Sequence, residues 1–446
     1  MTEAGTKIEQ MTGVLATLWA IPAPGPDNIL QDPAFVQLRA HCEAHYPSAV
    51  AGTGLTFALA DALRSLGLPC MVRAGTPVDG LSLDMAAARL VAGLETRSIT
   101  RRYLCPLDLA DDLPALEFGP VRLRQYTKAE LADLFDDERL RRLYPSHRLD
   151  SARLAQFQWL IVEETESDVP EIGRRALPFF YDLGSDLGAI DAHAGQYAPA
   201  VIEALFPLLL EPWEDWNSLV GVGGDWRGFL VPWVHVETGD LFVRPRMPPN
   251  ADGLTWEEAY GHDGEDYERP VIVHLDSEAQ DRLARLDQAC WDKVQAAART
   301  DLFSTPIQHF LVRGFFTEGM DQIMSHMTAI EAALGMQADF GEPPPGIAKM
   351  GSKKRLTKRI EALLGNKAPA NDYAALFELR SRFVHGRAFG GKVSSEERNK
   401  ARRLARTVIA ALIDVAAGPA GTMTREDYLW SLGKAATDNV RCRPPR

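Results

Sequence analysis

The pattern of apolar residues changes at residues 300–306, and this change constrains the fold more than any other feature of the chain. Before it, runs that alternate like half-buried strands stand between stretches with helical spacing. After it, apolar residues recur every three or four positions. The helical segments, in chain order, are Ile307–Gly319, Gln322–Leu334, Lys353–Leu364, Tyr373–Val384 and Glu396–Ala416. The sequence therefore predicts an all-α helical bundle over residues 305–440, with short connections.

Residues 1–95 are expected to form a mostly helical N-terminal segment. Asp32 is a suitable N-cap and Pro33 suits the first helical position, which predicts a helix that ends at Cys42. Thr53–Leu66 carries apolar residues at helical spacing and predicts a second helix.

Residues 96–300 are expected to form an α+β domain. Their strand patterns, in chain order, are Ser98–Cys105, Val121–Tyr126, Phe157–Val162, Phe229–Val236, Leu241–Val243 and Val271–Leu275. Thr238-Gly239-Asp240 predicts a tight turn that joins two of these strands in a hairpin. Thr127 and Glu130 form a capping box that opens a helix, and Ser277 is expected to cap a long helix over Glu278–Ala298. The predicted fold class is an α+β N-terminal region followed by an all-α bundle.

Charge is distributed unevenly along this chain, whose formal net charge is −13. Residues 301–446 carry 22 Lys and Arg against 15 Asp and Glu, a net of +7, whereas residues 1–300 carry 26 against 46, a net of −20. A basic C-terminal domain attracts phosphate groups even when it is tethered to an acidic one. The alternative is that two solvated surfaces of opposite sign dock on each other.

The cysteines and the apolar runs indicate a cytoplasmic protein that does not enter a membrane. The chain has 5 scattered cysteines, an odd number that argues against a disulfide framework and for a reducing compartment. No apolar run reaches the ~18–20 residues that span a bilayer. The first residues also lack the basic and apolar segments of a signal peptide.

Arg380, Ser381 and His385 form the group of residues that best suits catalysis. Histidine acts as a general acid or base near neutral pH, and a fixed guanidinium binds phosphate and stabilises charge that develops on it. Ser381 is placed to orient either partner. Together they suit RNA cleavage by attack of the 2′-hydroxyl on the adjacent phosphate, a reaction that needs neither metal nor cofactor. Five helical steps turn Arg380 and His385 ~140° apart, and a histidine before glycine also serves as a plain C-terminal cap.

The run Leu379–Gly386 (LRSRFVHG) resembles the R-x4–6-H motif of the HEPN superfamily. It is most similar to the ApeA-like branch, whose motif helix reads L-R-S-x-x-V-H-G. Met327–Leu334 resembles the "LEaLl" helix of this family. Ser352–Gly365, with Arg359, resembles the basic helix that precedes the motif helix. The three segments also agree in order and spacing, and the resemblance covers about residues 305–420.

The resemblance implies that Arg380 and His385 are the catalytic pair and that Ser381 supports them. It implies a homodimer in which two motif helices face each other, so that Arg380 of one subunit and His385 of the other meet on one phosphate. It further implies RNA cleavage in defence against phage or other selfish elements, with residues 1–300 as sensor of a trigger ligand or protein. Some HEPN bundles have lost catalysis and only dimerise or bind nucleic acid or protein, which is the alternative.

Glu331 is expected to support the site. It lies mid-helix in an apolar run, where an isolated carboxylate is costly. Arg359 or Arg380 is therefore its expected partner, either in a structural ion pair or in a supporting role at the active site.

Candidate RNA contacts are Lys354, Lys358, Arg382 and Arg387. The first two belong to a predicted basic helix face made of Lys353, Lys354, Arg355, Lys358 and Arg359. A solvated face is the alternative for that helix. Arg382 is also placed to pair with Glu378 one turn earlier.

No metal site is predicted. His41 and His45 have the spacing of zinc ligands, but no third ligand follows in a suitable motif. The acidic residues around Gly184 and Gly188 lack an EF-hand pattern and indicate a surface loop. Four tryptophans, which are expected to pack in a core or to line a ligand groove, are Trp213, Trp216, Trp226 and Trp233.

Overall fold

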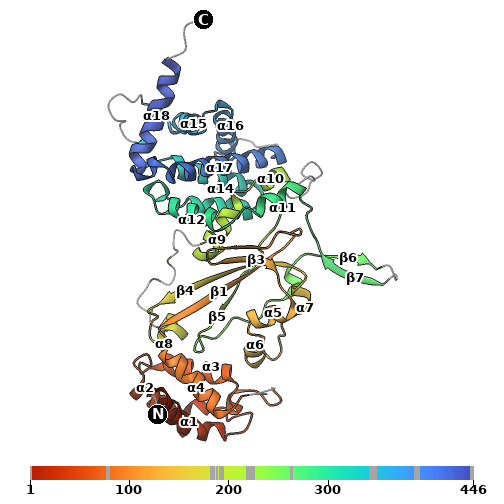
Figure 1. Cartoon of the computed structure of the whole chain (residues 1–446), viewed down its shortest axis with the longest axis vertical. Coiled ribbons are helices and arrows are strands. Elements are labelled where there is room, and N and C mark those ends of the chain that lie inside the picture. The colour runs from red at the N-terminus through yellow and green to blue at the C-terminus, as the bar shows by residue number, and fades with distance from the viewer. Residues whose placement is uncertain are drawn as a thin grey trace. The chain divides into compact units, whose positions relative to one another are not determined.

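The computed structural model divides into two compact units (Figure 1). It describes residues 3–76, 81–180, 186, 189, 195–216, 227–261, 265–340, 349–385 and 392–441. Unit 1 comprises residues 1–106, 125–190 and 232–269. Unit 2 comprises residues 107–124, 191–231 and 270–446. Each unit is thus built from chain segments that are distant in sequence.

Unit 1 contains a helical subdomain with its own apolar core. Its helices are α1 (Glu3–Trp19), α2 (Pro33–His45), α3 (Thr53–Leu66), α4 (Leu83–Glu95) and α8 (Ile172–Ala176). Phe35, Leu59 and Leu90 are fully buried in the core that these helices share. The predicted helix over Thr53–Leu66 is confirmed. Asp32 caps α2 by accepting a hydrogen bond from the Ala34 amide at 2.8 Å, and the helix ends at His45, beyond the predicted end.

Three strands of unit 1 lie in the order β4-β1-β5. Their bounds are Gln158–Ser167 for β4, Ser98–Leu107 for β1 and His235–Thr238 for β5. β1 and β5 are antiparallel, with Arg101 opposite Thr238. Leu104, Trp159 and Ile161 of this sheet are buried with apolar residues of α5 (Lys128–Leu134), α6 (Asp137–Leu143) and α7 (Ser151–Leu154). A separate two-stranded ribbon, β6 (Trp256–Tyr260) and β7 (Asp266–Pro270), completes the strands of this unit.

The hairpin predicted around residues 238–240 is wrong. β5 covers only His235–Thr238, and residues 241–243 are not a strand. Backbone carbonyls of this segment instead accept hydrogen bonds from the buried guanidinium of Arg139. It donates to the carbonyl oxygens of Thr238 at 3.1 Å, Asp240 at 2.8 Å and Val243 at 2.6 Å. The capping box of Thr127 and Glu130 is confirmed at the start of α5.

Unit 2 begins with the antiparallel strands β2 (Leu116–Phe118) and β3 (Val121–Gln125), the latter at a predicted strand. The predicted strand over residues 271–275 is reduced to isolated bridge residues, Ile272, which pairs with Leu109, and Leu275. The long helix predicted after residue 277 is broken in two, α11 (Ser277–Leu283) and α12 (Gln288–Ala298). Asp276 caps the first, one residue before the predicted cap, and Asp287 starts the second by accepting from the Cys290 amide at 3.0 Å.

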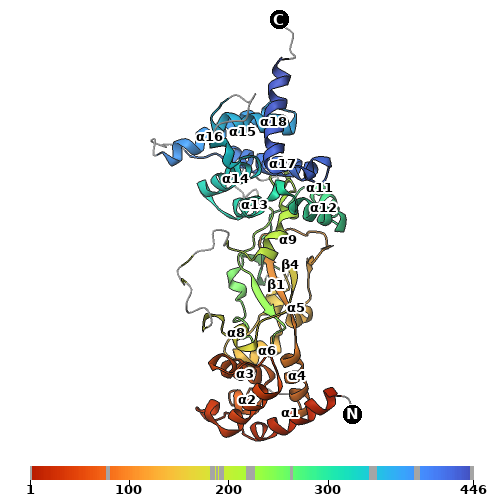
Figure 2. The same cartoon turned by 90° about the vertical axis from the view of Figure 1, so that its left-hand side faces the viewer.

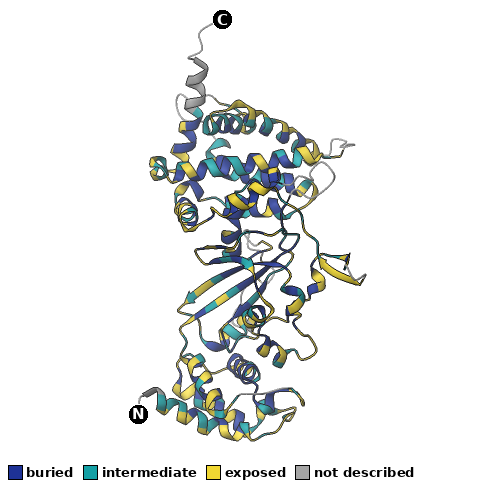
Figure 3. Ribbon diagram, turned by 45° about the vertical axis from the view of Figure 1, so that its right-hand side comes forward, coloured by how far each residue is buried: buried dark blue, intermediate teal, exposed yellow. Residues whose placement is uncertain are grey.

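The remainder of unit 2 is a helical bundle. The five predicted helices are present as α13 (Ile307–Phe316), α14 (Gly319–Leu334), α15 (Ser352–Leu364), α16 (Lys367–Val384) and α17 (Ser395–Ala416). α13 ends three residues earlier than predicted, and α16 begins six residues earlier. The five helices are joined by α9 (Pro199–Leu209), α10 (Trp213–Trp216) and α18 (Arg425–Arg441). Figure 3 shows how buried and exposed residues alternate along α17, the longest of these helices. The chain therefore combines an α+β region with a helical bundle.

Two of the four tryptophans noted in the sequence belong to the core of unit 2. Trp213 and Trp216 are buried, with ring centroids 5.3 Å apart. Trp233 is half-buried against an apolar cluster of unit 1, and Trp226 lies outside the described residues. The packing interpretation thus holds for the described tryptophans.

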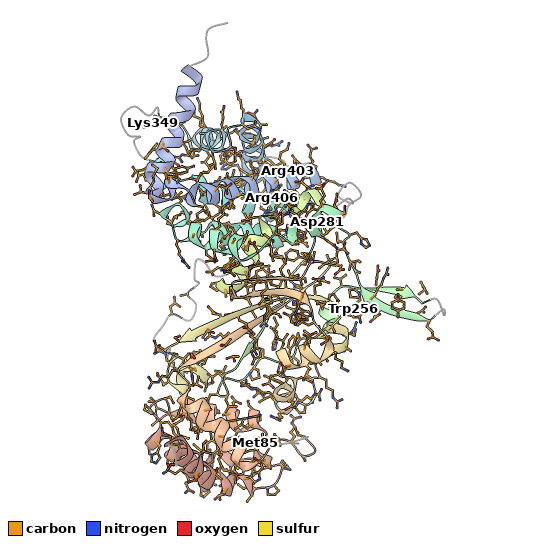
Figure 4. All side chains as sticks on the ribbon, in the orientation of Figure 1. Met85, Trp256, Asp281, Lys349, Arg403 and Arg406 are labelled. Atoms are coloured by element: carbon orange, nitrogen blue, oxygen red, sulfur yellow. The ribbon has the colours of Figure 1, made fainter. Side chains whose placement is uncertain are left out.

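Buried charge joins α10 to α17. The Glu214 carboxylate is fully buried and lies 3.6 Å from Nε of Arg402, whose side chain is also fully buried. Arg406 donates to the same carboxylate from Nε at 2.9 Å and from a terminal nitrogen at 2.7 Å. Arg403, labelled with Arg406 in Figure 4, pairs with the more exposed Asp215. Glu214 thus pairs with two arginines inside the bundle, and Asp215 lies 3.5 Å from the second of them, Arg406.

No helix among the described residues is both long and apolar enough to cross a membrane.

Removal of the Glu214 charge is expected to destabilise unit 2. In Glu214→Gln the fully buried Arg402 loses its counter-charge, which costs about 3–5 kcal/mol of unfolding free energy. Chemical denaturation followed by circular dichroism measures this loss. Asp414→Asn in α17 is the control: its side chain is 67% exposed and pairs with Lys293, and the same chemical change there costs about 0–1 kcal/mol. Equal effects of the two substitutions would contradict the assignment.

Acidification is expected to destabilise unit 1 through His235. Burial, and secondarily the charge of Arg246, lowers the pKa of His235 to about 4. Between about pH 6.5 and pH 4 the unfolded chain therefore binds a proton that the folded chain does not, so stability falls as pH falls. The unfolding free energy of the wild type should drop by up to about 3 kcal/mol over this range.

His235→Phe should flatten that pH dependence, because phenylalanine fills the ring site beside Phe135, where the ring centroids lie 4.9 Å apart. Denaturation curves recorded across the pH range give the slope. His147→Gln, at an exposed position, should leave the slope of the wild type unchanged. A slope that survives His235→Phe would show that other groups titrate.

Candidate functional site

The motif residues lie at the C-terminal end of α16, and local contacts fix both ends of this helix. The Asn366 side chain accepts a hydrogen bond from the Ala368 amide at 2.9 Å and so caps the first turn. Val384 is the last helical residue, and His385 is the C-cap, with φ −91° and ψ 13°. The His385 amide still donates to the Ser381 carbonyl at 3.1 Å. His385 therefore leaves the helix while its backbone stays tied to the last turn.

Arg380, Ser381 and His385 line one cavity of about 550 Å³ in unit 2. Its walls come from α14, α15, α16 and the residues directly after α14; Figure 2 shows these helices packed together. The ~140° expected between the Arg380 and His385 side chains applies only when both residues are helical. His385 lies just beyond the end of α16, so this angle does not apply to it. The imidazole is exposed, so a ligand in the cavity can reach it.

Arg380 forms an ion pair with Glu331 of α14. Both side chains are about a quarter exposed, at 27% and 28%. The expectation that Glu331 pairs with one of two arginines is thus met by Arg380. The pair places the guanidinium at the cavity wall and holds α14 against α16.

Tyr373 lies behind this ion pair. Its side chain is fully buried, and its hydroxyl lies near the Glu331 carboxylate. Burial, followed by the nearby charge of Glu331, raises the pKa of the Tyr373 hydroxyl. The phenol is therefore neutral at any ordinary pH and adds no charge to the site.

Arg359, which the sequence offers as a supporting residue and a possible partner of Glu331, pairs with a different carboxylate. It is fully buried and binds Asp339 through two hydrogen bonds, at 2.6 Å and 2.8 Å. The same guanidinium donates to the Leu334 carbonyl at 2.7 Å and to the Leu429 carbonyl at 3.2 Å. Arg359 is absent from the cavity wall, whereas Asp339 is part of it. Arg359 thus supports the site by fixing the chain that forms its wall.

The predicted basic face of α15 is wrong in part. Arg355 is 4% exposed and lies 3.3 Å from Asp339, so it points inward together with Arg359. The amphipathic helix turns these two residues toward a buried carboxylate and not toward solvent. Of the predicted face, Lys353, Lys354 and Lys358 are left at or near the surface.

The candidate RNA contacts lie outside the cavity. Lys354 and Arg382 are exposed and Lys358 is half-buried, and none of the three lines the cavity. Arg387 lies outside the described residues. Glu378, the predicted partner of Arg382, forms an ion pair with Lys353 of α15. The role of these residues in RNA binding stays a prediction.

The structure adds residues that sequence reasoning missed. Tyr373 and Phe377 line the cavity together with Arg380, and their spacing of four and three residues puts them on one face of α16. That spacing is readable in the sequence. Gln337 and Asp339 also line the cavity, but they lie between helices, where no local pattern marks them.

No metal centre is found in the described part of the chain: no group of three or more His, Cys, Asp or Glu side chains there is placed to hold an ion. The rings of His41 and His45 lie 4.5 Å apart, centroid to centroid. The acidic loop around Gly184 falls mostly outside the described residues.

Comparison with known proteins gives one partial similarity. No family model matches the chain, and no solved structure matches it. A ribonuclease HII of Paramagnetospirillum magneticum (strain ATCC 700264 / AMB-1) is 38% identical to this chain over 132 residues. The aligned part covers 29% of this chain and 56% of that protein, so the chain spans about half the length of this curated relative.

Proposed function

We propose that this protein is an endoribonuclease of HEPN type that cleaves RNA without a metal ion. The observation that carries the proposal is that Arg380, Ser381 and the exposed His385 line a single cavity in a helical bundle. The partial similarity to a ribonuclease supports an activity on nucleic acid. The setting implied by the HEPN resemblance is defence against phage or other selfish elements, with unit 1 as sensor or regulator.

The proposed reaction uses only side chains of the cavity. Neutral His385 accepts the proton of the 2′-hydroxyl, whose oxygen then bonds to phosphorus. The bond from phosphorus to the 5′-oxygen breaks, and this oxygen takes up the proton from the imidazolium. Arg380 stabilises the negative charge that builds on the phosphate oxygens, while Ser381 orients the phosphate. Lys354, Lys358, Arg382 and Arg387 are proposed to hold the flanking phosphates of the RNA.

The proposed active form is a homodimer joined through the bundle of unit 2. Phe383 and Val384, at the end of α16, are 46% and 55% exposed. Large apolar side chains exposed next to each other are typical of an interaction surface, and a second copy of α16 would cover them. A dimer of this kind brings two motif helices, and so two sets of Arg380 and His385, to one interface.

A second candidate function is a non-catalytic module that dimerises and binds nucleic acid or protein. The ion pair between Arg380 and Glu331 favours it. This carboxylate neutralises the guanidinium that the reaction needs for phosphate. If Glu331 holds Arg380 permanently, the cavity binds RNA weakly and does not cleave it.

Cleavage of single-stranded RNA or transfer RNA in the presence of EDTA tests the proposal. The wild type should cleave, and His385→Ala and Arg380→Ala should each lose about 100-fold or more of the rate, the usual worth of a general base or of a charge-stabilising group. Gel analysis of end-labelled RNA gives the rates.

His274→Ala and Arg285→Ala are the matched controls for that experiment, because both residues are exposed in unit 2 and neither lines the cavity. Their rates should equal that of the wild type. Equal cleavage by all variants would refute the assignment. RNA binding without cleavage by the wild type would favour the non-catalytic module.

Phe383→Asp should weaken the dimer. An aspartate in an apolar interface has to be desolvated, so the dimer dissociation constant measured by analytical ultracentrifugation should rise about tenfold or more. Phe57→Asp, at a phenylalanine of α3 that is 43% exposed, makes the same chemical change in unit 1 and should leave the constant unaltered. A monomeric wild type at micromolar concentration would exclude this dimer.

A further inference from the structure

The cavity that holds the motif is larger and more apolar than a phosphate group requires. It measures about 550 Å³, and Arg380, Ser381 and His385 occupy only part of its wall. Leu356, Phe377 and other apolar side chains form much of the remainder. Cavities of a few hundred Å³ with apolar walls and a few polar groups are typical of sites that enclose an organic ring system. The wall is therefore suited to a ligand with an apolar face next to its phosphate.

An aromatic side chain stands one helical turn from the phosphate-binding arginine. Phe377 is half-buried and lines the cavity, and three residues of α16, ~4.5 Å of rise, separate it from Arg380. Tyr373 backs it from the preceding turn, with the two ring centroids 6.1 Å apart. Lys353 approaches Phe377, with its Nζ 5.7 Å from the ring centroid. The order along the helix is thus aromatic ring and then guanidinium, which matches the order of base and phosphate within a nucleotide.

Polar groups that suit the edge of a base also line the cavity. Gln337 and Ser352 line the same cavity. An amide donates and accepts hydrogen bonds, and a hydroxyl does both, which is the pattern needed to pair with the edge of a heterocyclic base. Asp339 does not serve this purpose, because Arg359 engages both of its oxygens.

The geometry points to a subsite for one unpaired nucleobase of single-stranded RNA, stacked on Phe377 and read at its edge by Gln337, beside the phosphate at Arg380. The placement of the phosphate rests on the function proposed above. Proteins that read single-stranded RNA commonly stack extruded bases on aromatic side chains. A base held in this cavity fixes which phosphate reaches His385, so Phe377 and Gln337 are positioning residues that confer sequence preference. Duplex RNA, whose bases are stacked and paired, would not enter.

Binding of small ligands to the full-length His385→Ala protein tests the subsite without any need for cleavage. Isothermal titration compares the four nucleoside 5′-monophosphates with ribose 5-phosphate. At least one monophosphate should bind about tenfold or more tighter than the sugar phosphate, which is the scale of one base–aromatic stack. Phe377→Leu should abolish that difference, and Gln337→Ala should reduce the preference among the four bases.

Phe57→Leu makes the same change at an exposed phenylalanine of unit 1 and should leave the difference intact. Circular dichroism spectra of each variant establish that it is folded. Equal affinity for ribose 5-phosphate and all monophosphates, or a preference that survives Phe377→Leu, would overturn the subsite and leave a site for phosphate alone.

A second measurement separates this inference from the proposed nuclease. A single-stranded RNA with one abasic ribose at each position in turn is offered to the wild type. If one abasic position lowers kcat/KM about tenfold or more, the base is bound during the reaction. If every abasic RNA is cut as fast as the parent, the nuclease stands and the subsite fails. If no RNA is cut while the monophosphates bind as expected, the subsite stands and the nuclease fails.

Discussion

The cavity of unit 2 depends on the buried guanidinium of Arg359. From α15 it binds Asp339, the end of α14 at the Leu334 carbonyl, and α18 at the Leu429 carbonyl. A guanidinium keeps its charge and holds five N–H donors in one plane, so this side chain fixes three chain segments in one geometry. Its charge has to be balanced inside the core, and Asp339 does so with both oxygens. The wall that faces α16 is therefore set before any ligand arrives.

Because several arginines are buried, the net charge of the chain overstates the positive charge at the surface of unit 2. Residues 301–446 carry a net charge of +7, which by itself suggests a surface that attracts phosphate. Arg355, Arg359, Arg402 and Arg425 are nevertheless buried, and they bind carboxylates or backbone carbonyls. Part of the positive charge thus stabilises the bundle and produces little field outside it. At the cavity, Arg380 is the arginine on the wall and Glu331 pairs with it, so the attraction that a phosphate would meet there depends on the placement of charges more than on the total.

Local patterns in the sequence predict the helices well, because helical periodicity and capping are properties of neighbouring residues. α3 agrees with its prediction at both ends, and α17 begins only one residue early. Arg380, Ser381 and His385 lie within one short run of the sequence, so the run itself was enough to propose them as a site. The predictions that were wrong concern contacts between residues far apart in the sequence. Arg139, for example, donates hydrogen bonds to carbonyls about a hundred residues away, in the segment that was predicted to form a hairpin. The spacing of residues in α15 does not predict whether the Arg359 side chain is solvated or pairs with Asp339. The aromatic residues of α16 line a cavity only because other helices pack around them.

The ion pair between Arg380 and Glu331 decides whether the cavity can work as a catalyst. A fully buried pair would hold the arginine too firmly, because either charge left alone would cost several kcal/mol. Because each side chain is about a quarter exposed, solvent screens the pair. Its contribution to stability therefore falls toward the ~0–1 kcal/mol of surface ion pairs. A phosphate dianion or diester that enters the cavity can therefore compete for the guanidinium at small cost. In the proposed reaction, Glu331 would then act as a weak restraint that keeps Arg380 oriented in the empty site and releases it to a phosphate.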